Sequence, residues 1–246
     1  MSIRTLLLLA IIFCFPLGLN AQQDSIMIGL KRNKTFLQKS ILPVSLIVGG
    51  ALVNGSNFEK SFQRDVRNTV GNNYYFGIDD YTRYVPVIEM YSADAFGVKA
   101  KNHWFDQSKN LTISLVVSDF ITYQLKKWTH KRRPNGKDDF HSFPSGHTTV
   151  AFTTASVLYQ EFKGSSPFLA YSGYAFATTT GAFRVMNNAH WMSDVIVASG
   201  IGILVTKLVY LFDPIIKWNP FKKIRGVSFI PNIDNNHFGF YFSKTF

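Results

Sequence analysis

Between residues 38 and 213 the chain is a succession of apolar segments, each long enough for a helix and separated from the next by a short polar break. Segment 147–162 lacks the clean polar stripe of a surface helix, which predicts burial in a bundle or contact with lipid. The pattern predicts an all-α fold, a bundle of about six helices. The six segments cover residues 40–54, 82–98, 110–129, 147–162, 167–186 and 190–212.

The pattern changes after Asp213-Pro214, a pair typical of a helix end. Residues 226–246 contain two runs of β-prone residues on either side of a turn rich in Asn, Asp and Pro, which predicts a short β-hairpin. The predicted organisation is therefore a helical domain over residues 22–213 and a C-terminal tail over residues 214–246.

The first 21 residues have the pattern of an export signal. Arg4 precedes an apolar run over residues 6–17, and the small residue Ala21 stands at the expected cleavage position. A permanent N-terminal anchor is the alternative, but the run is short for a bilayer span and Pro16 interrupts it. We therefore predict a signal peptide over residues 1–21 and export to the cell envelope.

Charge and cysteine content narrow the function classes. The formal net charge of +11 predicts an anionic partner. Export and the lack of a long Lys/Arg tail argue against nucleic acid, which leaves an anionic membrane surface or a phosphorylated small molecule. The single cysteine, Cys14, lies in the predicted signal, so a mature chain without it excludes a disulfide scaffold, a cysteine nucleophile and cysteine metal ligands.

The relation to a membrane rests on two uncharged stretches. Residues 40–58 and 165–183 approach the length that a bilayer core requires. Asp119 and Lys207 interrupt other segments, and the mean hydropathy of +0.04 is low for a protein made mostly of membrane spans. Small residues suited to helix contacts in lipid favour membrane embedding or tight association over a soluble exported protein.

One sequence cluster pairs a histidine with a carboxylate. His190 and Asp194 are four residues apart, so on a helix they share a face, and the carboxylate can accept the proton of one ring nitrogen. The other nitrogen is then free to act as a nucleophile or base. Taken alone, this stretch also fits a surface helix with an incidental His and Asp.

A second cluster, residues 144–147, opens segment 147–162. Ser145 offers a hydroxyl, Gly146 permits close backbone approach, and the free N–H groups of a helix start favour an anion. His147 is placed to donate a proton to a leaving oxygen. Taken alone, this second cluster also fits a turn with Ser145 as the N-cap of a helix. Residues 126–134 alone also fit a solvated basic face. Cationic contacts for a phosphoryl group would come from Lys126, Arg133 and Arg184.

Taken in order, the three clusters resemble the motifs of the type 2 phosphatidic acid phosphatase superfamily, which also includes bacterial class A acid phosphatases and vanadium haloperoxidases. The chain has Lys126, six residues and Arg133-Pro134; then Pro144-Ser145-Gly146-His147; then Arg184, five residues, His190, three residues and Asp194. It departs at Phe183, where the family usually has Ser, and the nine-residue gap 135–143 is shorter than is common in the family.

The resemblance implies a helical bundle and a role for each motif residue. His190 would attack phosphorus to give a phosphohistidine, Asp194 would orient it, and His147 would protonate the leaving alcohol and later activate water. Binding of the phosphoryl oxygens would fall to Lys126, Arg133, Ser145, Gly146 and Arg184. No metal or other cofactor is expected, because these cations and the helix start supply the charge.

The implied function is a metal-independent phosphatase of a lipid or isoprenoid phosphate in the cell envelope, with its active site facing the periplasm or exterior. Alternatives are a soluble exported acid phosphatase of broad specificity, a vanadium haloperoxidase and a non-enzymatic basic binding module. The expected partners are a phosphorylated lipid or other phosphomonoester and an anionic membrane surface, with no nucleic acid. Outside the motifs, we expect His103, His130, His141 and His237 to be structural or exposed. Of these four, His141 is the one close enough to the second motif to touch a substrate.

Overall fold

The computed structural model describes residues 35–216, 219, 227–234 and 237–244. The predicted signal peptide, residues 1–21, lies outside the described residues. Residues 35–216 are all-α, as the sequence predicts. Their helices are α2 (Phe36–Val53), α3 (Asn57–Val70), α4 (Asp79–Thr82), α5 (Val85–Ala95), α6 (Trp104–Thr129), α7 (Gly146–Phe162), α8 (Pro167–Met186) and α9 (Met192–Phe212).

The expected number of about six helices was too low, because the described residues form eight. Helix α3 contains no apolar segment, because it is a polar helix that buries only Glu59, Gln63 and Val66. These residues recur at the spacing of one helix face, so α3 is amphipathic rather than apolar. The other addition, α4, is a helix of four residues.

Side chains at the helix starts explain several boundaries. Thr35 caps α2, where its hydroxyl and the side chain of Gln38 form a capping box. Ser56 accepts a hydrogen bond from the Glu59 amide at the start of α3. Pro167 is the first residue of α8, a position where its missing N–H costs nothing.

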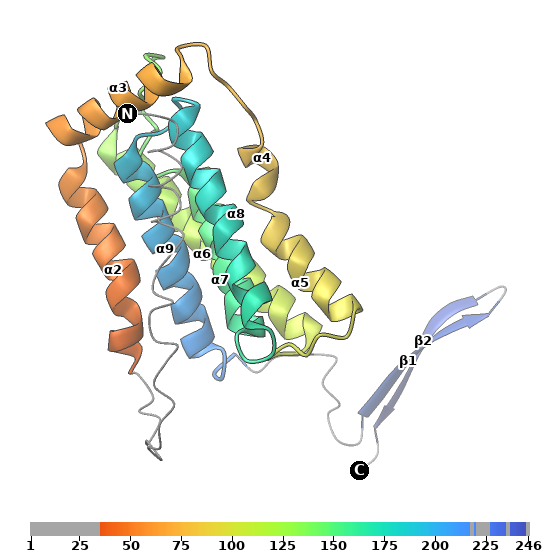
Figure 1. The fold of residues 1–246 in the computed structure, drawn as a ribbon. Helices are drawn as coiled ribbons and strands as arrows, with labels where there is room; N and C mark the ends of the chain where they lie inside the picture. Colours follow the sequence, from red (N-terminus) through yellow and green to blue (C-terminus); the bar gives the residue numbers. More distant parts are fainter. Residues whose placement is uncertain (1–34, 217–218, 220–226, 235–236, 245–246) are drawn as a thin grey trace, which may run out of the picture.

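Helix α7 lies at the centre of the bundle and packs against α6, α8 and α9, while α2 packs along the far side of α9 (Figure 1). Ala151, Ala155, Val157, Leu158 and Phe162 of α7 are fully buried. Figure 1 also shows α3 lying across one end of the bundle, next to the end of α8 and the start of α9. The last turn of α6 and the first turn of α7 belong to the same end.

Close helix packing around α9 depends on two glycines. A Cβ added at Gly200 would lie 2.7 Å from the Pro43 carbonyl oxygen of α2. At Gly202 it would lie 2.8 Å from the Thr153 amide nitrogen of α7. Because a backbone cannot move aside as a side chain can, α9 reaches both neighbours only with glycine at these positions.

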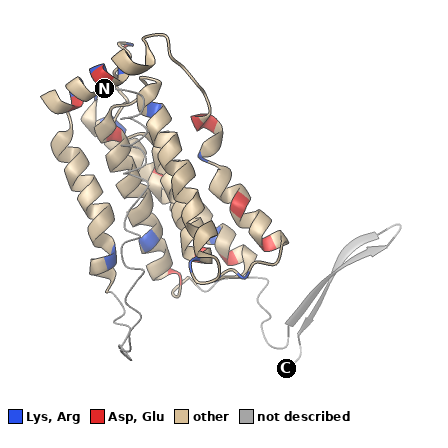
Figure 2. Ribbon diagram, viewed as in Figure 1, with Lys and Arg blue, Asp and Glu red and all other residues tan. Residues whose placement is uncertain are grey.

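Among the helices of the described residues, α2 and α9 are long and apolar enough to cross a membrane by length and composition. The apolar window of α9 is 61% buried, as in a core helix, whereas that of α2 is only 17% buried. Exposed apolar side chains of α2 include Leu37, Ile41, Leu42, Val48 and Leu52. In Figure 2, α2, α8 and α9 have their Lys, Arg, Asp and Glu residues toward the helix ends. Helix α2 therefore presents an apolar surface that no described residue covers.

Beyond the helices, strands β1 (Val227–Asp234) and β2 (His237–Lys244) are paired antiparallel. The register runs from Val227 opposite Lys244 to Asp234 opposite His237.

Candidate active site

The motif residues predicted from the sequence lie together at the end of the bundle that α3 crosses. Lys126 is in the last turn of α6, Ser145 caps α7, and Arg184 is in the last turn of α8. Contacts between the segments fix their positions: the Ser145 amide donates to the Asp194 carbonyl, and the His190 amide donates to that of Arg184. Four segments far apart in the sequence thus meet in one site.

His190 and Asp194 pair, although not on one helix face as expected. Helix α9 begins at Met192, so His190 precedes it, and Asp194 in the first turn accepts a hydrogen bond from the Trp191 amide at 2.9 Å. This places the Asp194 Oδ2 atom 3.4 Å from His190 Nδ1. The pair is buried, and His190 is only 2% exposed.

Burial sets the charge of His190. It lowers the imidazole pKa to about 4, although the hydrogen bond to Asp194 acts to raise that pKa. At neutral pH the ring is therefore uncharged. With Nδ1–H directed at Asp194, the lone pair is on Nε2, as a nitrogen nucleophile requires.

Asp194 is held by a buried ion cluster that the sequence reasoning missed. Lys131 Nζ lies 2.9 Å from Asp194 Oδ1, 3.0 Å from Glu59 Oε1 and 2.8 Å from Ser193 Oγ. The Ser142 hydroxyl also donates to the Asp194 carboxylate. Lys131 lies in the predicted basic cluster, but Glu59 comes from α3, which showed no apolar signal.

Glu59 connects α3 to the site through further bonds. It accepts hydrogen bonds from the Gly55 amide at 2.7 Å and the Ser193 amide at 3.1 Å. The second of these amides belongs to the first turn of α9, beside Asp194. Through Glu59, the orientation of the Asp194 carboxylate depends on α3 being in place.

The residues predicted to bind phosphate include three cations, and there is open space beside Gly146. Lys126 donates to the His141 carbonyl at 2.6 Å, and burial together with Arg133 lowers its pKa to about 8. Arg184 Nε is buried without a hydrogen-bond partner among the described residues. A Cβ added at Gly146 would meet nothing within 4 Å, so there is room for a ligand over the start of α7.

Two carboxylates of α4, also unpredicted, face this group. Asp79 Oδ2 lies 2.8 Å from an Arg184 guanidinium nitrogen, and Asp79 also accepts from the Asn187 amide group at 3.0 Å. His147 Nε2 lies 2.7 Å from Asp80 Oδ1. Burial lowers the His147 pKa, and the bond to Asp80 acts in the opposite direction. Asp80 therefore favours the protonated imidazole that an acid needs.

Only one group of side chains in the described part of the chain could hold a metal ion. Ligand atoms of Asp79, Asp80 and His147 lie within 4.8 Å of one another. In this structure Asp79 pairs with Arg184, and Asp80 pairs with His147. No metal was expected from the sequence.

Other histidines occupy peripheral positions. His103 caps α6 by accepting from the Phe105 amide, and His130 ends that helix in a left-handed conformation with φ of 43°. The exposed His141 ring lies beside Asp139. The side chain of His237 lies outside the described residues.

Comparison with known proteins places these motifs in a family. The PAP2 superfamily matches residues 107–218, which contain all three motifs. The lipid A 1-phosphatase of Porphyromonas gingivalis is 31% identical over 158 residues, or 64% of this chain. The chain spans about a third, 35%, of that relative's length.

One solved structure has a similar fold. The first transmembrane PAP2-type phosphatidylglycerolphosphate phosphatase from Bacillus subtilis superposes with a TM-score of 0.51 at 20% identity, over 74% of this chain and 99% of that one. LpxE of Aquifex aeolicus gives a TM-score of 0.48 at 19% identity, over 65% and 98% of the chains. Residues 107–218 of this chain, which carry all three motifs, thus match the PAP2 superfamily.

Proposed function

We propose that this protein is a membrane-associated phosphatase that removes the terminal phosphate of a lipid without a metal ion. The observation that carries the proposal is the pairing, at one end of the bundle, of a buried neutral histidine with a second histidine that has its own carboxylate. Three cations and the start of α7 border the same space. The named relative, a lipid A 1-phosphatase, adds support for a lipid phosphate as substrate.

The proposed reaction has two displacements at phosphorus. His190 Nε2 forms a P–N bond while the bond from phosphorus to the lipid oxygen breaks, and His147 gives its proton to that oxygen. His147 then takes a proton from water, whose oxygen attacks phosphorus and breaks the P–N bond to release phosphate. Asp194 positions His190 throughout.

Charge neutralisation in this scheme comes from the protein. Lys126, Arg133 and Arg184 bind the phosphoryl oxygens, together with Ser145 and the amides that begin α7 at Gly146. These donors are fixed by the fold before substrate arrives, so they stabilise the developing charge without reorganising.

Apolar surface supports a lipid rather than a water-soluble substrate. Helix α2 exposes six large aliphatic side chains to the surroundings.

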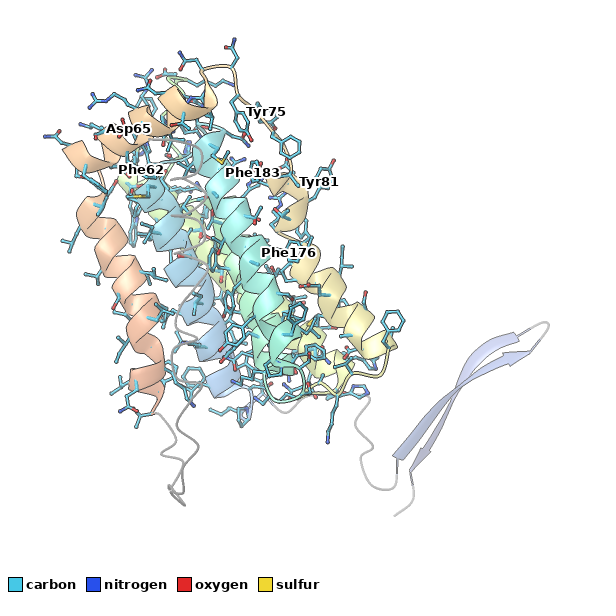
Figure 3. The ribbon with its side chains drawn as sticks, in the orientation of Figure 1. Phe62, Asp65, Tyr75, Tyr81, Phe176 and Phe183 are labelled. Atoms are coloured by element: carbon cyan, nitrogen blue, oxygen red, sulfur yellow. The ribbon has the colours of Figure 1, made fainter. Side chains whose placement is uncertain are left out.

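The lipid tail is proposed to lie between α8 and the segment around α4 and α5. Tyr75 and Tyr81 are exposed there, and Figure 3 shows them on the same side of the molecule as Phe176 and Phe183 of α8. The rings of Phe76 and Phe183 are 5.6 Å apart between centroids. Phe183, the departure from the family motif, thus adds apolar surface where the tail would leave the site.

The remaining sequence predictions complete the proposal. Residues 1–21 act as a signal peptide, the site faces the periplasm or exterior, and residues 22–213 form the catalytic domain. Residues 214–246 form a tail with a β-hairpin.

Assaying purified protein in chelator tests the function. We expect phosphate release from long-chain lipid phosphates in detergent, faster than from p-nitrophenyl phosphate. Equal rates on both substrates would favour a soluble acid phosphatase. Halide oxidation with vanadate and peroxide, in the absence of phosphate release, would overturn the proposal in favour of a haloperoxidase.

A further inference from the structure

We propose that a basic hollow bordered by the segments that carry Arg133 and His190 binds a second anionic group on the head of the substrate lipid. The inference rests on the proposed function, because it extends the same site. It assigns the substrate class: a lipid whose hydroxylated head carries another phosphoryl group in addition to the one removed.

The hollow lies between α3 and two catalytic loops and has a volume of about 400 Å³. Pro134 directly follows the phosphate ligand Arg133, and Trp191 directly follows His190. The hollow therefore borders the segments that carry Arg133 and His190. The hollow is lined by Lys60, Gln63, Arg64, Arg67, Asn68, Asn72, Pro134, Asn188 and Trp191.

Its charge is positive and not neutralised. Lys60, Arg64 and Arg67 recur at the spacing of one side of α3. Glu59 precedes Lys60 but is buried and paired with Lys131. Within residues 35–216, neither Lys60 nor Arg64 has an acidic partner within 4.0 Å. Two cations are therefore available to an anion from solution.

The same hollow also contains a buried hydrogen-bond acceptor that no described residue satisfies. Gln63 is 4% exposed; its Nε2 donates to the Val185 carbonyl at 3.2 Å and to Asn188 Oδ1 at 2.7 Å. Its Oε1 is buried and has no partner within the described residues. A buried amide oxygen without a donor is uncommon, and a hydroxyl group supplies what it lacks.

Together these features point to a hydroxylated, phosphorylated head group. Lys60 and Arg64 suit a phosphate, the amides of Asn68 and Asn72 suit hydroxyls, and Trp191 offers an aromatic face. Phosphatidic acid has no second anionic group to place here. Phosphatidylglycerol phosphate and a bisphosphorylated glycolipid both have one.

Arg67 has a different part in this surface. Its guanidinium donates to the Met186 carbonyl at 2.7 Å and to the Asn72 carbonyl. It thus ties the end of α8 to the loop after α3. A test of ligand binding should therefore change Lys60 and Arg64, which make no such bonds, and leave Arg67 intact.

The test compares two substrates in the full-length protein. We expect kcat/KM for phosphatidylglycerol phosphate to exceed that for phosphatidic acid, and the double variant Lys60→Gln/Arg64→Gln to lower the ratio of the two about tenfold. Lys99→Gln is the matched control, since it removes an exposed cation from the loop before α6, at the other end of the bundle. The control should keep the wild-type ratio.

A binding arm separates this inference from the proposed function. In the His190→Ala background, calorimetry with glucose 1,6-bisphosphate and glucose 1-phosphate should show about tenfold tighter binding of the bisphosphate, and the double variant should lose that preference. Equal binding of the two sugars, or an unchanged substrate ratio in the double variant, overturns the inference even if lipids are hydrolysed. Absence of hydrolysis with every lipid overturns the proposed function, while the calorimetry still decides on the hollow.

Discussion

Replacing Lys131 by methionine tests how the catalytic pair is held. In the wild type its ammonium lies 2.9 Å from Asp194 and 3.0 Å from Glu59, and these two residues are 0% and 1% exposed. Methionine has a similar length but no charge, so two buried carboxylates would lose their shared cation.

The expected cost follows from the burial of both acids. Removing one member of a buried ion pair costs about 3–5 kcal/mol, because the remaining charge stays desolvated. We expect Lys131→Met to lower the free energy of unfolding by about 3 kcal/mol or more. Glu59→Gln alone should cost less, because Lys131 keeps its bond to Asp194.

The assay is denaturant unfolding in detergent, followed by circular dichroism, with both single variants and the double variant. In Lys131→Met/Glu59→Gln only one buried carboxylate lacks its cation, so stability should partly recover relative to Lys131→Met. A loss below about 1 kcal/mol in Lys131→Met, or strict additivity in the double variant, would refute the reasoning.

Four further predictions concern single residues. Gly202→Ala should cost about 1–3 kcal/mol, because its Cβ would meet the α7 backbone at 2.8 Å, whereas Gly146→Ala should leave thermal stability intact and lower phosphate release. Lys126 loses its charge above its pKa of about 8, so kcat/KM should fall above that pH, and Lys126→Arg should keep the plateau to higher pH. Asp80→Asn removes a bond that raises the His147 pKa, so the alkaline limb of kcat should move to lower pH; an unmoved limb contradicts the role of His147 as the acid. Arg184→Lys should reduce kcat/KM strongly, and near wild-type turnover would show that Arg184 is peripheral.

The sequence alone predicted most of the residues that the structure brings together in the candidate site. His190, Asp194, His147 and the three cations follow from local patterns, and the apolar segments predict the long helices that bring them together. The burial of α7 and of the core face of α9 could also be predicted, because a continuous apolar segment is rarely stable unless it is buried.

Residues whose role depends on a distant partner escaped prediction. Glu59, Asp79 and Asp80 sit in polar stretches where an acid is expected to be solvated, and only the packing of α3 and α4 onto the site gives them Lys131, Arg184 and His147 as partners. The start of α9 was also placed two residues early, since the Asp194 bond to the Trp191 amide fixes it at Met192.

Trapping the covalent intermediate is the most direct test of the central claim. Protein mixed with a lipid phosphate carrying ³²P in its terminal group, in chelator, is quenched with alkali within milliseconds and digested for mass spectrometry. The account predicts an acid-labile, base-stable phosphoryl group on His190, absent from His190→Ala and more abundant in His147→Ala with a good leaving group. Undiminished label in His190→Ala, or label on another residue in the wild type, would contradict it.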